Sequence, residues 1–337
     1  MTEKKRILIA RTDRLGDVLM ALPSIDYLRA ALPEAQIDFL CRPEYADVVR
    51  PYLSSHGVSV VTVTPAEKVS LKRKNYSALL LLYGDKRVAK AGFSARIAVR
   101  VGIYSKVWSF LILTSGLRQK RSKAQKNEAL YNLDLAKLLV SKVSGNTIDV
   151  KLTPIELKGE ERSHQKARFA LEDIGLDPDS PFILIHPGMG GSAANLSPKG
   201  YLDLINAFST VSSFPVVLSI GPSPKDREMG RVILEKNEKM KVIRHVSLPV
   251  LREIFRLAHT VVAPSTGPIH LAHLVGTRTI GLYSPFQSER KERWAPFGGT
   301  GQSLVLSPEY ENADENCMER VDWPGLILKS DNGLTHP

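Results

Sequence analysis

The stretch RILIARTDRLGDVLM, residues 6–20, joins an apolar strand to an amphipathic helix through a turn rich in charge. The apolar run predicts a strand over residues 6–11, and the helical period that follows predicts a helix over residues 18–32. Asp17 stands immediately before that helix, so its simplest role is a helix N-cap. A carboxylate at this position could also accept a proton from a substrate hydroxyl. A cap does not explain the other charged residues of the turn, which are Arg11, Asp13 and Arg14.

The alternation of short apolar strands and amphipathic helices continues through the chain. It predicts an α/β fold with two Rossmann-like, doubly wound parallel sheets. The alternation lapses over residues 149–161, so we expect an N-terminal domain over residues 1–155 and a C-terminal domain over residues 156–325. Residues 326–337 are expected to form a disordered tail. Ligands of such sheets bind outside the carboxyl ends of the strands, which predicts a site in a crevice between the two domains.

The composition limits the classes of protein that fit. The 337 residues include only two cysteines, Cys41 and Cys317, which is typical of a protein from a reducing compartment. The first residues show no signal-peptide pattern, and no apolar run approaches the ~20 residues that span a bilayer. We therefore expect a cytoplasmic protein or one on the inner face of a membrane. No nucleic-acid-binding signature is present, so nucleic acid is not an expected partner.

The net charge of +11 is concentrated in one segment. Between Asp85 and Glu128 the chain has eleven Lys or Arg residues and no acid. This pattern fits a solvated basic face or a mobile loop, but a field of one sign also attracts phosphates and acidic lipids. Inside the segment, VWSFLIL at residues 107–113 adds a short apolar stretch between basic flanks, which suits an anionic membrane surface.

A glycine-rich loop, HPGMGGSAANLS at residues 186–197, lies between a predicted strand and a predicted helix. Backbone N–H groups of glycines can approach phosphate oxygens closely, and the helix N-terminus favours an anion. The loop also matches the dinucleotide pattern G-x-G-x-x-A. The next strand ends in SIGP, without the acid that would hold a ribose, so a nicotinamide-dependent oxidoreductase is disfavoured. The candidate phosphate-binding residues are Gly188, Gly190, Gly191 and Ser192.

A third loop, APSTGPIHLAHLVGT at residues 263–277, begins another helix. Ser265 and Thr266 stand where a helix cap belongs, and Pro268 fits the first turn. The amides around Gly267 would then form an anion site. His270 follows within one turn; a lone histidine here is often structural, but beside a second phosphate-type loop it favours a diphosphate contact.

These loops resemble the motifs of glycosyltransferase family 9, the ADP-heptose:lipopolysaccharide heptosyltransferases. The resemblance lies in ILIARTDRLGDVLMALPSIDYLRAALPEAQIDFL (residues 7–40), ILIHPGMGGSAANLSPKGYLDLI (183–205), residues 248–285 around the third loop, and RWAPFG (293–298). It implies a GT-B fold with the donor on the C-terminal half. It also implies an inverting transfer without a metal ion, from a nucleotide sugar to the inner core of lipopolysaccharide. Asp17 matches the catalytic base of the family, and Thr266, Gly267 and His270 match its donor-phosphate motif.

The resemblance also implies the partners. They would be a nucleotide sugar, which is a substrate and not a cofactor, an acceptor glycolipid bearing acidic Kdo sugars and phosphates, and an anionic membrane surface. The acceptor would lie on the N-terminal half. The candidate acceptor-binding residues are Asp13, Arg14, Arg96, Arg118, Lys120, Arg121 and Lys123.

Two positions depart from the family pattern. Ser265 stands where many members carry Asp or Asn, and Ala194 stands near the position of a donor-loop lysine. We hypothesise that Arg293, or its neighbours Arg290 and Lys291, supplies the missing positive charge. The departures leave two alternatives open: a transferase that uses a different nucleotide sugar, or a nucleotide-sugar-binding protein with weak catalysis.

Overall fold

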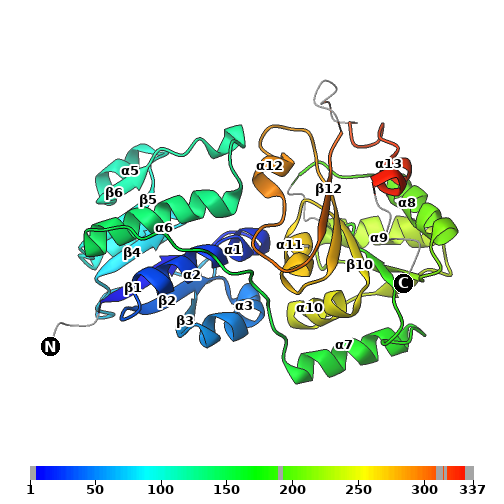
Figure 1. Cartoon of the computed structure of the whole chain (residues 1–337), viewed down its shortest axis with the longest axis horizontal. Helices are drawn as coiled ribbons and strands as arrows, with labels where there is room; N and C mark the ends of the chain where they lie inside the picture. Colours follow the sequence, from blue (N-terminus) through cyan, green and yellow to red (C-terminus); the bar gives the residue numbers. More distant parts are fainter. Residues whose placement is uncertain (1–4, 189–192, 309–313, 315–316, 331–337) are drawn as a thin grey trace. The chain divides into compact units, whose positions relative to one another are not determined.

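The computed structural model describes residues 5–188, 193–308, 314 and 317–330 (Figure 1). The chain divides into two compact units. Unit 1 runs to Arg121 and includes Gln125–Leu157, and unit 2 comprises Ser122–Ala124 and the chain from Lys158 onward. The change of unit after Leu157 lies two residues beyond the predicted boundary. The crevice between the units stays a prediction.

Unit 1 is built on a six-stranded parallel sheet with the order β3-β2-β1-β4-β5-β6. The strand order reverses between the neighbours β1 and β4, so the loops after these two strands lie together at the switch point of the sheet. The strands are β1 (Arg6–Ala10), β2 (Gln36–Cys41), β3 (Val58–Thr62), β4 (Ala78–Leu81), β5 (Val99–Ile103) and β6 (Ser115–Leu117).

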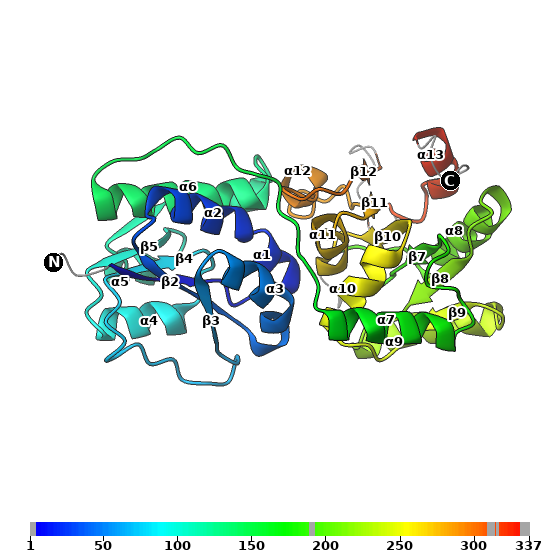
Figure 2. The same ribbon diagram turned by 60° about the horizontal axis from the view of Figure 1, so that its bottom comes forward.

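The helices of unit 1 cover both faces of this sheet (Figures 1 and 2). Helix α2 packs against α6, which also contacts β4 and β5, while α4 contributes buried residues to a core cluster with β1 and β4. The helices are α1 (Leu15–Leu19), α2 (Leu22–Ala31), α3 (Pro43–Ser55), α4 (Lys86–Ser94), α5 (Val107–Ile112) and α6 (Glu128–Ser144), with a short 3₁₀ helix, η1 (Arg121–Lys123).

The helix predicted over residues 18–32 is wrong, because the chain forms α1 and α2 in its place. Pro23 has no N–H group to donate to the carbonyl of Leu19, so a continuous α-helix is interrupted there. Asp17 lies in the first turn of α1 and is not its N-cap; that position is Arg14, which makes no capping bond through its side chain.

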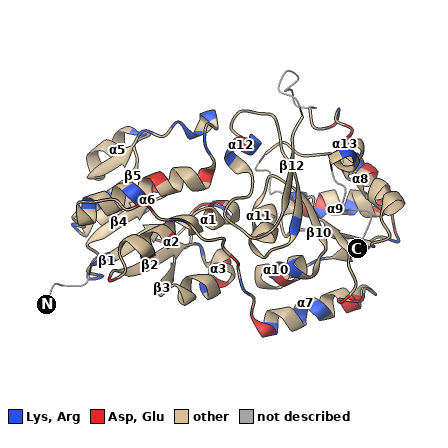
Figure 3. Cartoon of the chain, viewed as in Figure 1, with Lys and Arg blue, Asp and Glu red and all other residues tan. Residues whose placement is uncertain are grey.

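The basic segment is ordered, so its interpretation as a mobile loop is wrong. It contains α4, β5, α5, β6 and η1, and β5 pairs with β4 on one side and β6 on the other. Figure 3 shows Lys and Arg residues along the chain that leads from β6 toward α6. The basic side chains therefore stand on a fixed framework.

Unit 2 repeats the architecture with a six-stranded parallel sheet of order β12-β11-β10-β7-β8-β9. Its switch point lies between β7 and β10, which are the strands that precede the two predicted phosphate loops. The strands are β7 (Ile183–Ile185), β8 (Val216–Ser219), β9 (Lys241–Ile243), β10 (Thr260–Pro264), β11 (Arg278–Leu282) and β12 (Ser303–Leu306).

The helices of unit 2 form two groups. Helices α7 and α11 both pack against α10, while α9 and α13 both pack against α8 (Figure 2). They are α7 (Glu161–Asp173), α8 (Pro198–Val211), α9 (Pro224–Lys236), α10 (Leu248–Leu257), α11 (Gly267–Leu274), α12 (Lys291–Trp294) and α13 (Trp323–Ser330). As predicted, Ser197 caps α8 and Pro198 is in its first turn.

The predicted disorder of residues 326–330 is wrong, because they belong to α13. Trp323 and Ile327 are almost fully buried in the core cluster that α8 lines, and this apolar contact anchors the helix. Residues 331–337 lie outside the described residues. Within the described part of the chain, no helix is both long and apolar enough to cross a membrane.

Candidate active site

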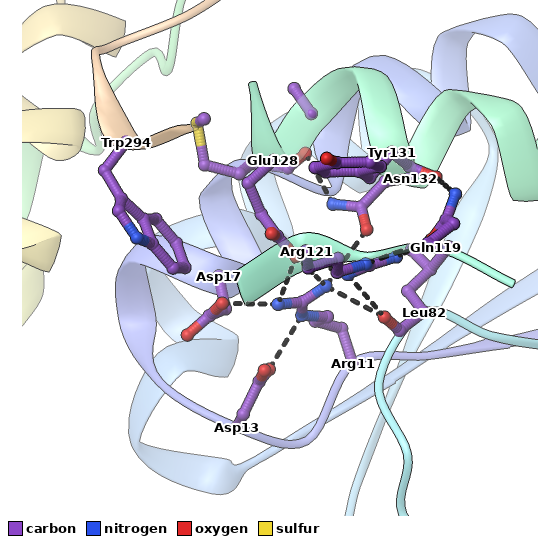
Figure 4. Close-up of polar contacts among 12 residues, drawn as sticks. Arg11, Asp13, Asp17, Leu82, Gln119, Arg121, Glu128, Tyr131, Asn132 and Trp294 are labelled. Atoms are coloured by element: carbon purple, nitrogen blue, oxygen red, sulfur yellow. Dashed lines mark hydrogen bonds and ion pairs between the residues drawn. The ribbon is translucent and has the colours of Figure 1, made fainter. Parts of the chain in front are cut away.

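The turn after β1 surrounds one buried guanidinium group, that of Arg11 (Figure 4). Its Nε donates to Asp13 at 2.8 Å, and its Nη2 donates to Asp17. Its Nη1 donates to the carbonyl of Leu82, in the loop after β4, at 2.9 Å. Because the loops after β1 and β4 meet at the switch point, one side chain ties both loops together.

Helix α6 supplies the remaining partners of Arg11 (Figure 4). Glu128 accepts from both terminal nitrogens at 3.1 Å, and the amide oxygen of Asn132 accepts at 3.0 Å. Asn132 also donates to the carbonyl of Met20 at 3.0 Å, next to the end of α1. The helix at the end of unit 1 therefore orients the turn that carries Asp17.

Asp17 has the geometry of a general base. One carboxylate oxygen accepts from Arg11, and no hydrogen bond from the described residues reaches the other oxygen. The side chain is 14% exposed, so this second oxygen can meet a substrate hydroxyl. Arg11 holds the carboxylate in a fixed orientation, as a proton acceptor requires.

Burial and charge shift two titrations in this cluster. Burial raises the pKa of Asp13 to about 7; the nearby Asp17 charge adds to the rise, and Arg11 opposes it. Burial alone would lower the pKa of Arg11, but Asp13, Asp17 and Glu128 raise it above its ordinary value. Arg11 therefore stays charged.

Arg121 was predicted to bind the acceptor, but in the structure its side chain contacts residues next to Arg11. It pairs with the fully buried Glu128 and donates to Gln119 Oε1 at 2.7 and 3.0 Å. Its guanidinium carbon lies 5.5 Å from the centre of the Tyr131 ring. These contacts make Arg121 part of the support of the Arg11 cluster.

The other predicted acceptor residues fall at two edges of the sheet. Arg14 is exposed in the turn after β1, and Arg118, Lys120 and Lys123 follow the carboxyl end of β6, which lies at the same sheet edge as that turn. Arg96 follows α4 and precedes β5, at the amino-terminal edge. Arg96 therefore lies at the opposite sheet edge from Asp17, and its predicted contact with the acceptor stays a prediction.

An exposed apolar and basic surface lies on α4 and α5, which we name the α4–α5 patch. Its apolar members are Phe93, Val107, Phe110 and Leu111, whose exposed fractions lie between 45% and 81%. Arg100 joins the helices, since its guanidinium lies 5.5 Å from the Phe93 ring centre and donates to the carbonyl of Ile112 at 2.8 Å. Arg118 lies over the Phe110 ring at 5.3 Å.

In unit 2 the helix N-terminus after β10 has the features of an anion site. Thr266 is the N-cap of α11 but makes no capping bond, and Pro268 lies in the first turn, as predicted. Among the described residues, Thr266 Oγ1 and His270 Nδ1 are buried polar atoms without a hydrogen-bond partner. Burial lowers the pKa of His270 to about 3, so its imidazole is neutral and can donate to a phosphate oxygen.

The glycine-rich loop begins beside a buried polar cluster that the sequence pattern did not indicate. His186 hydrogen-bonds through Nδ1 to Ser219 Oγ at 3.1 Å, and burial lowers its pKa to about 4. A Cβ at Gly188 would approach the Asp226 carboxyl group to 3.0 Å and His186 Nε2 to 3.1 Å, so a larger residue would require these side chains to shift. The strand-end histidine was the only available signal for this cluster. The predicted contacts of Gly190, Gly191 and Ser192 lie outside the described residues.

The segment that was expected to replace the donor-loop lysine lies next to that loop. Glu289 accepts from the backbone N–H of Ala194 at 2.9 Å, which brings the chain before α12 to the loop after β7. The Arg293 guanidinium stacks 4.4 Å from the centre of the Trp294 ring. Ser265 is partly buried and follows β10 at the switch point.

A cavity of about 480 Å³ opens beyond β8 and β9 of unit 2. This volume is in the range of ligand pockets. Its walls include Gly221 and Pro222 after β8, Arg227 on α9, and Arg244 and His245 after β9. The cavity is at the same sheet edge as the α11 N-terminus. No group of three or more metal-ligating side chains occurs among the residues that the structure describes.

Two doubly wound units, with buried unpartnered polar atoms of the described residues at one switch point and a held carboxylate at the other, fit the GT-B fold of glycosyltransferases. The model of the family Glycosyltransferase family 9 (heptosyltransferase) matches residues 66–320, and the chain belongs to this family. The family and the GT-B fold expected from the sequence are confirmed.

Individual proteins agree with this assignment. The chain is 26% identical over 334 residues to a Haemophilus influenzae protein provisionally named a glycosyltransferase, covering 96% of this chain and 95% of that protein. It shares its fold with Escherichia coli ADP-heptose lipopolysaccharide heptosyltransferase II, with 19% identity, a TM-score of 0.72 and coverage of 98% of both chains. The iron-containing dodecameric glycosyltransferase TibC of enterotoxigenic E. coli is also similar, with 10% identity, a TM-score of 0.54, and coverage of 99% of this chain and 77% of TibC.

Proposed function

We propose that this glycosyltransferase moves heptose from ADP-heptose to a Kdo- and phosphate-bearing lipopolysaccharide core, with inversion and without a metal ion. The observation that carries the proposal is a pair of polar environments: one Asp17 oxygen, and Thr266 Oγ1 and His270 Nδ1, have no hydrogen-bond partner among the described residues. In the proposed reaction Asp17 takes the proton of an acceptor hydroxyl as its oxygen attacks the anomeric carbon. The diphosphate leaves toward the amides at the start of α11.

The donor would lie along the carboxyl edge of the unit 2 sheet. Its diphosphate would accept hydrogen bonds from Thr266 and His270, which supplies partners that these atoms do not find among the described residues. Arg293 would add positive charge from the segment beside Ala194. The nucleoside would extend into the cavity beyond β8 and β9, which Gly221 lines.

The preferred donor can be identified by a thermal-shift panel of ADP, UDP, GDP and CDP, each with its sugar conjugates. We expect ADP-heptose. A ligand at 100 times its Kd stabilises the folded state by about 2.7 kcal/mol.

Nucleotide binding should depend on His270. His270→Ala should weaken ADP binding by about tenfold or more, because a hydrogen bond to a charged group contributes roughly 1.5–3 kcal/mol.

The matched control for this test is His164→Ala, which removes a histidine that lies on α7 of the same unit and is far less buried. It should leave the ADP shift unchanged. Equal ADP affinity in His270→Ala and the parent would contradict the assignment of the α11 N-terminus as the diphosphate site. A stronger shift with UDP-, GDP- or CDP-sugars would favour the alternative of a different donor. Donor binding without slow release of nucleoside diphosphate would favour a binding protein.

We further propose that the protein works in the cytoplasm and docks on the inner face of the cytoplasmic membrane through the α4–α5 patch. Val107 and Leu111 are 81% and 76% exposed, and basic residues lie on both sides of α5. A short apolar surface with basic neighbours is complementary to an anionic bilayer. Arg118, Lys120 and Lys123, at the same sheet edge as Asp17, would meet the acidic groups of the acceptor.

Replacing Val107 and Leu111 together by serine should reduce binding to vesicles containing phosphatidylglycerol by about tenfold or more, because each buried aliphatic side chain contributes roughly 1.5–3 kcal/mol. Co-sedimentation measures the bound fraction. Phe169→Ser is the control, since Phe169 is 68% exposed on α7 of unit 2. Binding should also fall as salt rises. Unchanged binding by the double variant, or equal binding to neutral phosphatidylcholine vesicles, would contradict membrane docking through the patch. The segment would then be interpreted as a solvated basic face.

A further inference from the structure

The charges around Arg11 do not balance. Two guanidinium groups, those of Arg11 and Arg121, face the three carboxylates of Asp13, Asp17 and Glu128. All five side chains are at most 14% exposed. When every carboxylate is ionised, this buried cluster carries one excess negative charge. A proton can remove that excess, and the geometry indicates which carboxylate holds it.

Asp13 is the carboxylate with the weakest compensation. Glu128 accepts from both arginines, whereas the one side-chain donor to Asp13 among the described residues is Nε of Arg11, the guanidinium that also binds Asp17 and Glu128. Asp13 also interacts with Tyr45 of α3, whose other charged neighbours are Arg14, Arg42 and Glu44. The pKa of Asp13 is raised to about 7, chiefly by burial, so its proton exchanges near neutral pH.

We propose that Asp13 controls the proton affinity of Asp17 through the arginine that they share. When Asp13 ionises, its negative charge competes for Arg11, so Asp17 attracts the acceptor proton more strongly. In the transfer, the acceptor oxygen bonds to the anomeric carbon, its proton moves to Asp17, and the bond from that carbon to the diphosphate oxygen breaks. The Asp13 proton goes to solvent beforehand. Asp13 is thus a positioning residue, and this inference rests on the proposed function.

The pH dependence of kcat tests this coupling. With ADP-heptose and Kdo-bearing lipid A, kcat of the parent should rise between pH 6 and 8.5 as Asp13 ionises. Asp13→Asn should lose that rise and turn over about tenfold more slowly at pH 8, with KM for ADP-heptose unchanged. Asp13→Glu, which keeps the carboxylate, should show the rise of kcat with pH that Asp13→Asn loses. Asp26→Asn is the matched control, since Asp26 on α2 is also largely buried but binds Tyr52 instead; its profile should equal that of the parent.

A second readout does not depend on activity. An acid whose pKa is raised in the folded protein favours folding while protonated, and this stability is lost as pH rises through that pKa. Asp13→Asn should therefore unfold only slightly above the parental temperature at pH 4.5 and well above it at pH 8. In an Asp17→Asn background the gain at pH 8 should shrink, because the neighbouring charge is gone.

These readouts separate the two proposals. A parental pH profile in Asp13→Asn, or an equal loss at every pH, would overturn the control of Asp17 by Asp13. If the parent transfers no heptose to this acceptor, the proposed function fails. The unfolding temperatures alone then test the coupling between Asp13 and Asp17. A gain at pH 8 of the same size with and without Asp17 would overturn the coupling.

Discussion

Replacing Asp17 by asparagine should lower the rate of sugar transfer by a factor of about 10²–10⁴, with nucleotide affinity unchanged. Asparagine keeps the size of the side chain and can still accept the hydrogen bond from Arg11 through its amide oxygen, but it cannot take up a proton. A positioned general base contributes roughly 10²–10⁴-fold to the rate. Asp17 belongs to unit 1, whereas the residues proposed to bind the diphosphate, Thr266 and His270, belong to unit 2. The loss should therefore appear in kcat.

Three measurements make this test selective. Release of nucleoside diphosphate reports turnover, thermal shift with ADP reports donor binding, and circular dichroism checks the fold. Asp47→Asn, which changes a 75% exposed aspartate on α3, should transfer at the parental rate. An Asp17→Asn enzyme that works within tenfold of the parent would remove Asp17 from the role of base.

Replacing Arg11 by methionine should destabilise the protein by about 3–5 kcal/mol, because removal of one partner leaves buried charges without compensation. Asp13, Asp17 and Glu128 would each lose a hydrogen-bond donor, and so would the carbonyl of Leu82. Transfer activity should also fall at temperatures where the variant is folded, since Asp17 loses its anchor. Urea unfolding followed by fluorescence measures the stability change.

The defect of the Arg11 variant should grow with pH. Without the guanidinium, the buried carboxylates bind protons more tightly in the folded state, so folding is favoured at acid pH and opposed as they ionise. Arg11→Met should therefore lie closer to the parent at pH 5 than at pH 8. Adding Glu128→Gln, which removes one uncompensated charge, should recover part of the loss. Arg168→Met is the control, because Arg168 forms a surface pair with Asp179 that contributes little. A pH-independent defect would contradict the electrostatic explanation.

Much of the fold could be predicted from local pattern. The alternation of strands and helices predicted two doubly wound halves, and Ser197, Pro198, Thr266 and Pro268 were predicted at the helix starts where they occur. Proline and capping residues act on their immediate neighbours, so their signal is local. The same reasoning failed around Asp17. It placed Asp17 before one continuous helix, whereas Asp17 lies within α1 and the helix is interrupted before Pro23. It also failed at α13, whose buried Trp323 and Ile327 lie just before a polar end of the chain.

Local sequence pattern was enough to predict the fold class, the loops after β7 and β10 and the carboxylate that follows β1. Folding in three dimensions was needed to show that Arg11 joins Asp13 and Asp17 to Glu128, 117 residues from Arg11, that Arg121 contacts this cluster and that Arg96 lies at the opposite edge. Periodicity reports which residues are buried, because burial follows the repeat of a helix or strand. It does not report which buried charges meet, because that depends on the strand order, which brings distant loops together at one sheet edge.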